Sequence, residues 1–519
     1  YLATTGTFNV AIGNSAGGAV TTGVQNTLIG GLAGDSLTDA DYNIALGYAA
    51  LSSDTLGSRS VAIGRNALLS QNFSSATASN NTAVGYEVGR NTTIGIDNSL
   101  FGSNAGYALT DSDGNVAVGR SALATDTLGH SSTAIGTWAL QNQNFTSATA
   151  SYNVAVGYNA GNDVTTGIQN TLIGGLAGDA ITTGANNASL GHLSLSANTT
   201  GGSNVALGAY ALYSNTTASD NTAVGKNALF VNTTGADNVA VGASSLDANT
   251  TGASNTGIGR SALGANTTAS NNTAVGYSAL TANTTGTNNT AVGQDALVLN
   301  TTGAGNTALG KNALTTNTTA ADNVAVGVSA LKLNTTGANN TAVGRSALLA
   351  NTTGHSNVSV GYGSLDNNTT GNFNSAVGFN ALTTNSTGTY NTAMGYEALG
   401  LATTASGNAA FGIFAAYNTT TGVGNTAFGG AEIGITNATL FNNTTGSYNT
   451  AMGTASLSAN TTANYNTGVG FQAGFVNQTG SYNTSIGYKA AYANTAANNT
   501  AVGYASLGAN TTGSENTAL

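Results

Sequence analysis

A unit of 17 residues recurs along almost the whole chain. Its form is clear from Asn272 to Asn288, which reads NTAVGYSALTANTTGTN. A glycine closes each NTAVG-like motif, and 24 of the 28 intervals between these 29 glycines are 17 residues long. A fixed short period sustained over a chain is typical of solenoids, in which each repeat contacts only its neighbours. We therefore expect each repeat to form one coil.

Each NTAVG-like segment is expected to be a short β-strand. The residue before the glycine is always apolar, and the residue two positions earlier is Val, Ile or Thr in most repeats. Residues two apart in a strand share a face, and β-branched residues suit a pleated surface. We predict that both columns point inward and form a core ladder that includes Val224, Val241, Val275 and Val292.

A second apolar column stands four residues after the glycine and includes Leu229, Leu263, Leu280 and Leu297. It predicts a second wall of the core. The segments between the two walls are rich in Gly, Asn and Thr, which favour tight turns. A 17-residue unit with a turn at each end leaves too few residues for a stable helix. The fold class that follows is all-β: a parallel β-solenoid, or β-roll, with one repeat per coil.

Small residues, mostly alanine, separate the two strand columns, as at Ala223 and Ala240. If the flanking columns face inward, this alanine column faces outward, where polar or long charged side chains are usual on an open strand. Two interpretations remain. The alanines pack closely against sister chains in a homo-oligomer, or they only let the strand twist.

Asparagine stands four residues before the glycine in 27 of the 29 repeats, with Ser60 and Ser132 as the exceptions. Identical asparagines in successive coils can hydrogen-bond to one another in a ladder. So repetitive a residue indicates a structural role and not catalysis. The predicted ladder includes Asn221, Asn238, Asn255, Asn272 and Asn289.

A second asparagine begins a recurrent Asn-Thr-Thr triplet, which is formally an N-glycosylation acceptor. Two interpretations are open: the asparagine forms a turn, or a secreted eukaryotic protein carries a row of glycans. The candidate sites are Asn198, Asn215, Asn232, Asn249, Asn266, Asn283, Asn300, Asn317, Asn334, Asn351 and Asn368. The residue after the glycine is often aromatic, as at Tyr277 and Tyr488, and would cover a neighbouring coil, meet a sister chain or stack on sugars.

Composition argues against several functional classes. Only 6% of the 519 residues are charged, and the ten basic residues are scattered in a chain of net charge -10, so nucleic acid is not an expected partner. No apolar run approaches the length of a membrane span. His130, His192 and His355 stand alone in their repeats, so we expect neither a metal site nor a cofactor. The repeat contains no catalytic motif, and we expect no enzyme activity.

The spacing divides one continuous repeat array into three regions. Residues 1–156 form four-coil blocks of 72 residues, each with one coil of 21 residues. Residues 157–429 hold sixteen successive 17-residue intervals. Residues 430–519 contain an insertion of seven residues and a deletion of one. Because the chain starts and stops inside the pattern, we expect it to be a segment of a longer polypeptide.

Several strings resemble a known type of repeat: SVAIGRNAL (Ser60 to Leu68), STAIGTWAL (Ser132 to Leu140), NVAVGYNAG (Asn153 to Gly161) and NTAVGYSAL (Asn272 to Leu280). They are similar to the head repeats of trimeric autotransporter adhesins and to the NTAVGY-AL repeats of phage tail-fibre and bacterial surface proteins. The resemblance implies a left-handed parallel β-roll with three chains side by side. The period here is longer than in most adhesin heads, because NTTG lengthens one turn.

These observations favour a non-enzymatic extracellular fibre, which would be the rod or adhesive shaft of a cell-surface adhesin or a phage tail fibre. Its partners would be copies of itself, as a homotrimer or a filament, and a receptor or glycan. Two alternatives are a self-assembling filament coated with glycans, and a rod that binds ice or a polysaccharide through threonines such as Thr284, Thr285, Thr301 and Thr302.

Overall fold

The chain forms a parallel β-solenoid of about 30 coils, with about 17 residues per coil. The computed structural model describes residues 5–431 and 437–519, and no helix occurs within these ranges. Two compact units divide the chain, Tyr1–Arg260 (unit 1) and Ser261–Leu519 (unit 2). The all-β fold predicted from the repeat is confirmed.

The strands of unit 1 are two or three residues long, and each pairs with strands in neighbouring coils. They are β1 (Val10–Ile12), β2 (Thr27–Ile29), β3 (Ile44–Leu46), β4 (Gly57–Ser58), β5 (Val61–Ile63), β6 (Thr77–Ala78), β7 (Thr82–Val84), β8 (Ser99–Phe101), β9 (Val116–Val118), β10 (Gly129–His130), β11 (Thr133–Ile135), β12 (Thr149–Ala150), β13 (Val154–Val156), β14 (Thr171–Ile173), β15 (Ala188–Leu190), β16 (Val205–Leu207), β17 (Thr222–Val224), β18 (Val239–Val241) and β19 (Thr256–Ile258).

The strands of unit 2 follow the same pattern. They are β20 (Thr273–Val275), β21 (Thr290–Val292), β22 (Thr307–Leu309), β23 (Val324–Val326), β24 (Thr341–Val343), β25 (Val358–Val360), β26 (Ser375–Val377), β27 (Thr392–Met394), β28 (Ala409–Phe411), β29 (Thr426–Phe428), β30 (Thr450–Met452), β31 (Thr467–Val469), β32 (Thr484–Ile486), β33 (Thr500–Val502) and β34 (Thr517–Ala518).

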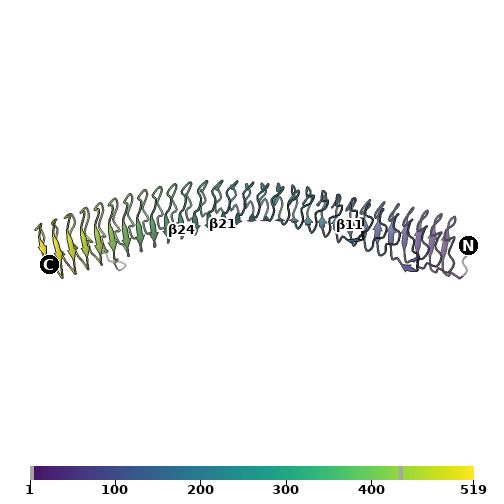
Figure 1. The fold of residues 1–519 in the computed structure, drawn as a ribbon, viewed down its shortest axis with the longest axis horizontal. Helices are drawn as coiled ribbons and strands as arrows, with labels where there is room; N and C mark the ends of the chain where they lie inside the picture. The colour runs from purple at the N-terminus through teal and green to yellow at the C-terminus, as the bar shows by residue number, and fades with distance from the viewer. Residues whose placement is uncertain (1–4, 432–436) are drawn as a thin grey trace. The chain divides into compact units, whose positions relative to one another are not determined.

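Successive strands pair in parallel and in register. In unit 2, Thr273, Ala274 and Val275 of β20 lie opposite Thr290, Ala291 and Val292 of β21. Strands near the labelled β21 and β24 lie side by side in the same way (Figure 1). Each sequence column is therefore a column in space, with equivalent residues of neighbouring coils about 4.8 Å apart.

The closing glycine makes the turn after each strand. Gly276 has a φ of +135°, a conformation that L side chains rarely adopt. A Cβ built on it would lie 2.6 Å from the carbonyl oxygen of Gly293 in the next coil. No side chain fits at this position, which explains why the repeat keeps glycine there.

The core lies between the middle residue of the strand and the residue four positions after the glycine. In most coils the first is Ala and the second is Leu, as at Ala342 and Leu348, and both are fully buried. In the coil of β2 the large and the small residue exchange these two positions. There Leu28 is the middle strand residue, and a Cβ on Gly34 would lie 2.9 Å from its Cδ2. Large and small residues therefore complement one another across a narrow interior.

Insertions leave the strand stack intact. Each 21-residue coil forms an extra pair of short strands with the coil before it, β6 with β4 and β12 with β10, and contains a buried phenylalanine, Phe73 or Phe145. The seven-residue insertion after Gly429 leaves β29 paired with β30. Its Leu440 is buried, while Ile433 lies outside the described residues.

Candidate interaction face and buried polar ladders

The first and third residues of each strand point away from the core. Val224, Val241, Val275 and Val292 are partly exposed, whereas the alanine before each of them is fully buried. The prediction that these valines form the core ladder is wrong, and so is the prediction of an outward alanine column. The period-two pattern was correct, but the face was inverted, because the narrow interior accepts only a small residue opposite leucine.

The second predicted column lies in the core. Leu229, Leu263, Leu280 and Leu297 are fully buried. Each has a φ between +51° and +54°, in the left-handed region. This conformation turns the chain sharply while the side chain fills the interior, so the backbone cost of about 1–2 kcal/mol is offset by burial.

The asparagines before the strand lie inside the coil and bond along the stack. The backbone N–H of Asn289 donates to Oδ1 of Asn272 at 2.9 Å, and its Nδ2 donates to the carbonyl of Gly303 at 2.8 Å. Asn238 bonds in the same way to Asn221, as does Asn255 to Asn238. Each amide thus links two coils and satisfies buried backbone groups.

The asparagines of the Asn-Thr-Thr triplets form a second ladder. Nδ2 of Asn300 donates to Oδ1 of Asn283 at 3.0 Å and to the carbonyl of Gly303 at 2.9 Å. A glycan attaches to this same nitrogen, which here is enclosed and already engaged. All eleven candidate sites are 0% exposed, which contradicts glycosylation in the folded coil: Asn198, Asn215, Asn232, Asn249, Asn266, Asn283, Asn300, Asn317, Asn334, Asn351 and Asn368.

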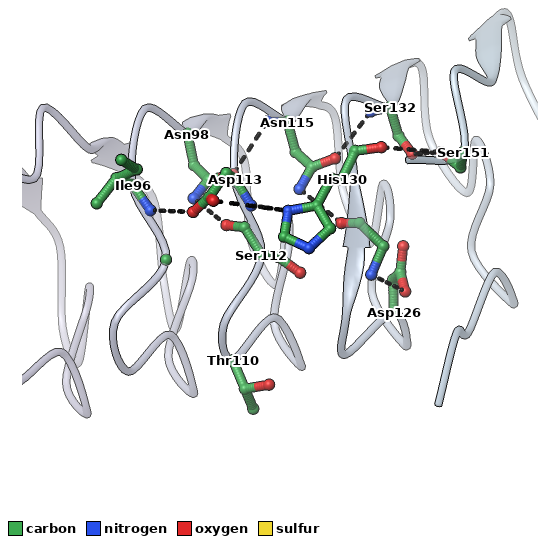
Figure 2. Close-up of polar contacts among 12 residues, drawn as sticks. Ile96, Asn98, Thr110, Ser112, Asp113, Asn115, Asp126, His130, Ser132 and Ser151 are labelled. Carbon is green, nitrogen blue, oxygen red and sulfur yellow. Dashed lines mark hydrogen bonds and ion pairs between the residues drawn. The ribbon is translucent and has the colours of Figure 1, made fainter. Parts of the chain in front are cut away.

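A third set of side chains accepts backbone N–H groups from the preceding coil. Oδ1 of Asp113 accepts the N–H of Ile96 at 2.8 Å, and Nδ1 of His130 accepts the N–H of Asp113 at 2.9 Å. Figure 2 shows this chain of bonds beside the asparagine ladder through Asn98 and Asn115. His130 therefore has a structural role in this turn, with its Nδ1 3.7 Å from Oδ2 of Asp113.

A buried carboxylate network that was not predicted from the sequence joins each 21-residue coil to the coil before it. Oδ2 of Asp54 accepts a bond from Nε2 of Gln71 at 2.7 Å, and Oδ1 accepts the N–H groups of Gly57 and Phe73. Burial raises the pKa of Asp54, and these hydrogen bonds oppose that shift. The second long coil repeats the network with Asp126 and Gln143. The signal was present in the sequence, because aspartate takes the position of the triplet asparagine only in the coil before each 21-residue coil, and glutamine takes it only in the 21-residue coils themselves.

The two threonines of each triplet differ in their surroundings. Oγ1 of Thr284 donates to the carbonyl of Thr301 at 3.1 Å, and Oγ1 of Thr301 donates to that of Thr318 at 3.0 Å. Thr285 and Thr302 are exposed. Only one of the two threonine columns therefore faces solvent.

Exposed side chains flank both ends of each strand. We define the entry edge as the two residues before the ladder asparagine, and the exit edge as the residue after the closing glycine. Aromatic rings stack along each edge between coils. On the entry edge the ring centroids of Tyr448 and Tyr465 lie 5.2 Å apart, and on the exit edge those of Phe471 and Tyr488 lie 5.5 Å apart. Arginine joins the exit-edge stacks, as where Arg345 lies over the Tyr362 ring.

Within residues 5–431 and 437–519, no group of three or more His, Asp or Glu side chains is arranged to hold a metal ion. His192 and His355 each pack edge-on against an aromatic ring, of Tyr210 and Phe373 respectively. The same ranges contain no helix long and apolar enough to cross a membrane.

The fold and the edges define a parallel β-solenoid protein with an exposed strand face. A comparison with models of known protein families found none that matches the chain, and a comparison with curated proteins found no match either.

Proposed function

We propose that this chain is a non-enzymatic structural rod of an extracellular fibre, which associates laterally with copies of itself. The observation that carries the proposal is the outer strand face. Its third column presents large apolar side chains to solvent, among them Ile258, Leu309, Met394 and Phe428, which are 40%, 47%, 43% and 54% exposed. Large apolar side chains exposed on one face of a protein are typical of interfaces between proteins.

The internal organisation supports a mechanical role. Polar groups that could recognise a small substrate are engaged in bonds between coils, as in the two asparagine ladders. The fold repeats one surface along each unit, which suits the spacing or display of binding sites. The resemblance to adhesin-head and tail-fibre repeats supports a place on a cell surface or a virion, with a receptor or glycan as the distal partner.

The test is self-association of the full chain, measured by sedimentation over a range of concentrations. We expect oligomers whose formation is lost in Val292→Glu/Val326→Glu, because both residues lie on the outer face of unit 2. The matched control is Thr285→Glu, which adds charge at an exposed turn. Monomers at every concentration would contradict the proposal.

A second candidate function is binding of a polysaccharide or ice through the exposed threonine column, which includes Thr285 and Thr302. Its support is limited to this single column, since the other threonine hydroxyls bond to the next coil. Thermal hysteresis and glycan-array binding test it, with Thr285→Val/Thr302→Val as the variant that removes hydroxyls and keeps the shape.

A further inference from the structure

The two edges of the outer face carry opposite charge. Six of the ten basic residues stand on the exit edge, which has no acidic residue: Arg65, Arg120, Lys226, Arg260, Lys311 and Arg345. Seven acidic residues stand on the entry edge: Asp41, Asp97, Asp113, Asp220, Asp237, Asp322 and Glu515. One arginine, Arg59, departs from the pattern by standing on the entry edge.

Each exit-edge base has an entry-edge acid at the same strand or one coil away. Lys226 and Asp220 flank the same strand, β17, and Arg120 and Asp113 flank β9. Each remaining exit-edge base has an entry-edge acid in the adjacent coil of its own unit, as Arg345 has Asp322. Among the described residues, the structure records no ion pair that joins the two edges. The two edges lie at opposite ends of an extended strand, with the paired positions on one strand six or seven residues apart in the chain.

Aromatic residues also occur on both edges of the same strand. Six strands have an aromatic side chain on both edges: Tyr42 and Tyr48 at β3, Tyr152 and Tyr158 at β13, Phe373 and Phe379 at β26, Tyr390 and Tyr396 at β27, Tyr465 and Phe471 at β31, and Tyr482 and Tyr488 at β32. The recorded ring stacks run along each edge, from coil to coil.

Some of these aromatics occupy unfavourable backbone positions. Tyr390, Tyr465 and Tyr482 have φ values of 58°, 56° and 61°, in the left-handed region, where a bulky residue is uncommon. They are also 64%, 50% and 61% exposed, so burial in their own chain does not offset the strain. The equivalent residue also has a positive φ in coils without an aromatic there, such as Ser254 and Asn288, so this turn belongs to the repeat and holds the rings on its exposed side.

We propose that the exit edge of one chain docks against the entry edge of a second, parallel copy at the same height along the stack. A rotation about an axis parallel to the stack brings unlike edges together, base to acid and ring to ring. A two-fold axis perpendicular to the stack would reverse one copy and lose this level-by-level match. The contact is therefore heterologous, and it closes into a ring around the apolar faces. This inference rests on the self-association proposed above and adds its orientation and register.

Site-directed cross-linking tests the register, because the chain has no cysteine. One chain carries Tyr152→Cys and a second, differing by a mass tag, carries Tyr158→Cys. They are produced together and treated with a short bifunctional maleimide. We expect cross-links between the two kinds of chain and none within a kind. The matched control, Thr166→Cys, lies at an exposed turn of the same coil and should not cross-link to the chains that carry Tyr152→Cys.

Charge reversal tests the edges. Lys226→Glu should weaken association about fivefold, since it places a carboxylate opposite Asp220 of the neighbour, and Lys226→Glu/Asp220→Lys should restore it. Lys332→Glu, which changes charge away from both edges, should have no effect. If the chains still associate but cross-links form only between like cysteines, the edge pairing is overturned. The same holds if association does not respond to charge reversal. Neither result would remove the self-association itself. Absence of any association would instead remove the proposed function.

Discussion

The same interior corner is filled in two different ways in the regular coils of unit 2 and in the coils of unit 1 that precede a 21-residue coil. In unit 2, Asn300 donates to Asn283 and accepts from Asn317, so the same bonds repeat from coil to coil. In unit 1, Asp54 occupies this corner and takes its bonds from Gln71 and two backbone N–H groups.

The difference lies in the balance of donors and acceptors. An amide can donate to the coil before it and accept from the coil after it, so identical coils stack directly. A carboxylate only accepts, so it needs a separate donor. That donor, Gln71 or Gln143, comes from the longer coil. A carboxylate fits this corner only where the next coil supplies a donor, and apolar residues such as Leu37 and Leu109 fill it elsewhere in unit 1.

The largest effect is expected when a regular coil receives the carboxylate without its donor. Asn300→Asp would direct an oxygen at Oδ1 of Asn283 and at the carbonyl of Gly303, where the amide now donates. A buried charge without a partner costs about 3–5 kcal/mol. We expect fast amide hydrogen exchange in the coils on either side, measured by mass spectrometry. Thr302→Asp is the control and should change exchange little, because Asp39 and Asp111 occupy this exposed column elsewhere.

The core offers a second comparison between the regions. Leu28 is tolerated in unit 1 because glycines oppose it, since Cβ atoms on Gly17 and Gly34 would lie 2.8 and 2.9 Å from its methyl groups. In unit 2, Ala342 lies in a core column with Leu331 and Leu348, all fully buried.

Ala342→Leu alone should therefore overpack the core and cost about 1–3 kcal/mol. Adding Leu331→Gly and Leu348→Gly reproduces the unit 1 arrangement and should recover part of the loss. Thermal unfolding followed by circular dichroism compares the two variants. A triple variant less stable than Ala342→Leu would contradict the complementary packing.

Much of the fold could be predicted from the repeat. The 17-residue period required one coil per repeat, and the leucine column required a second wall. The asparagine column predicted contacts along the stack, because only neighbouring coils bring identical residues together. These inferences depend only on the period of the sequence, which can be read without knowing the three-dimensional structure.

The direction of the strand faces could not be read from hydrophobicity. Val275 is more apolar than Ala274, yet Ala274 is the buried residue. The width of the interior decides which strand face is buried, and that width depends on the side chains that face the strand across the coil. One signal of the inward face was available in the sequence. In the coil of β2, Leu28 replaces the usual alanine and Gly34 replaces the usual leucine, and only residues that face each other need to compensate in volume. The glycosylation motif was misleading for a similar reason, because the Asn-Thr-Thr sequence does not indicate whether its asparagine is buried.

A smaller effect is expected from altering the donor balance in the long coil. Asp54→Asn places an amide nitrogen opposite Nε2 of Gln71, whose orientation is fixed by Asn81 Nδ2 donating to its Oε1 at 2.9 Å. An unmade buried hydrogen bond costs about 1–3 kcal/mol. Asp54→Asn/Gln71→Glu exchanges donor and acceptor and should restore most of the stability. Equal unfolding temperatures for the single variant and the parent chain would show that the network is dispensable.

The smallest expected effect is the pH dependence that Asp54 confers. Burial raises its pKa above the ordinary value of 3.8, while hydrogen bonds from Gln71, Gly57 and Phe73 partly oppose the shift. Because the folded pKa is the higher one, this group favours folding most below 3.8, and the contribution is lost as pH rises through the folded pKa. The unfolding temperature of the parent chain relative to Asp54→Asn should thus fall as pH increases from about 3 to about 7. A difference that increases with pH would mean that the hydrogen bonds outweigh burial, so that the long coil stabilises its carboxylate as an anion, in contrast to the uncharged corner of the regular coils.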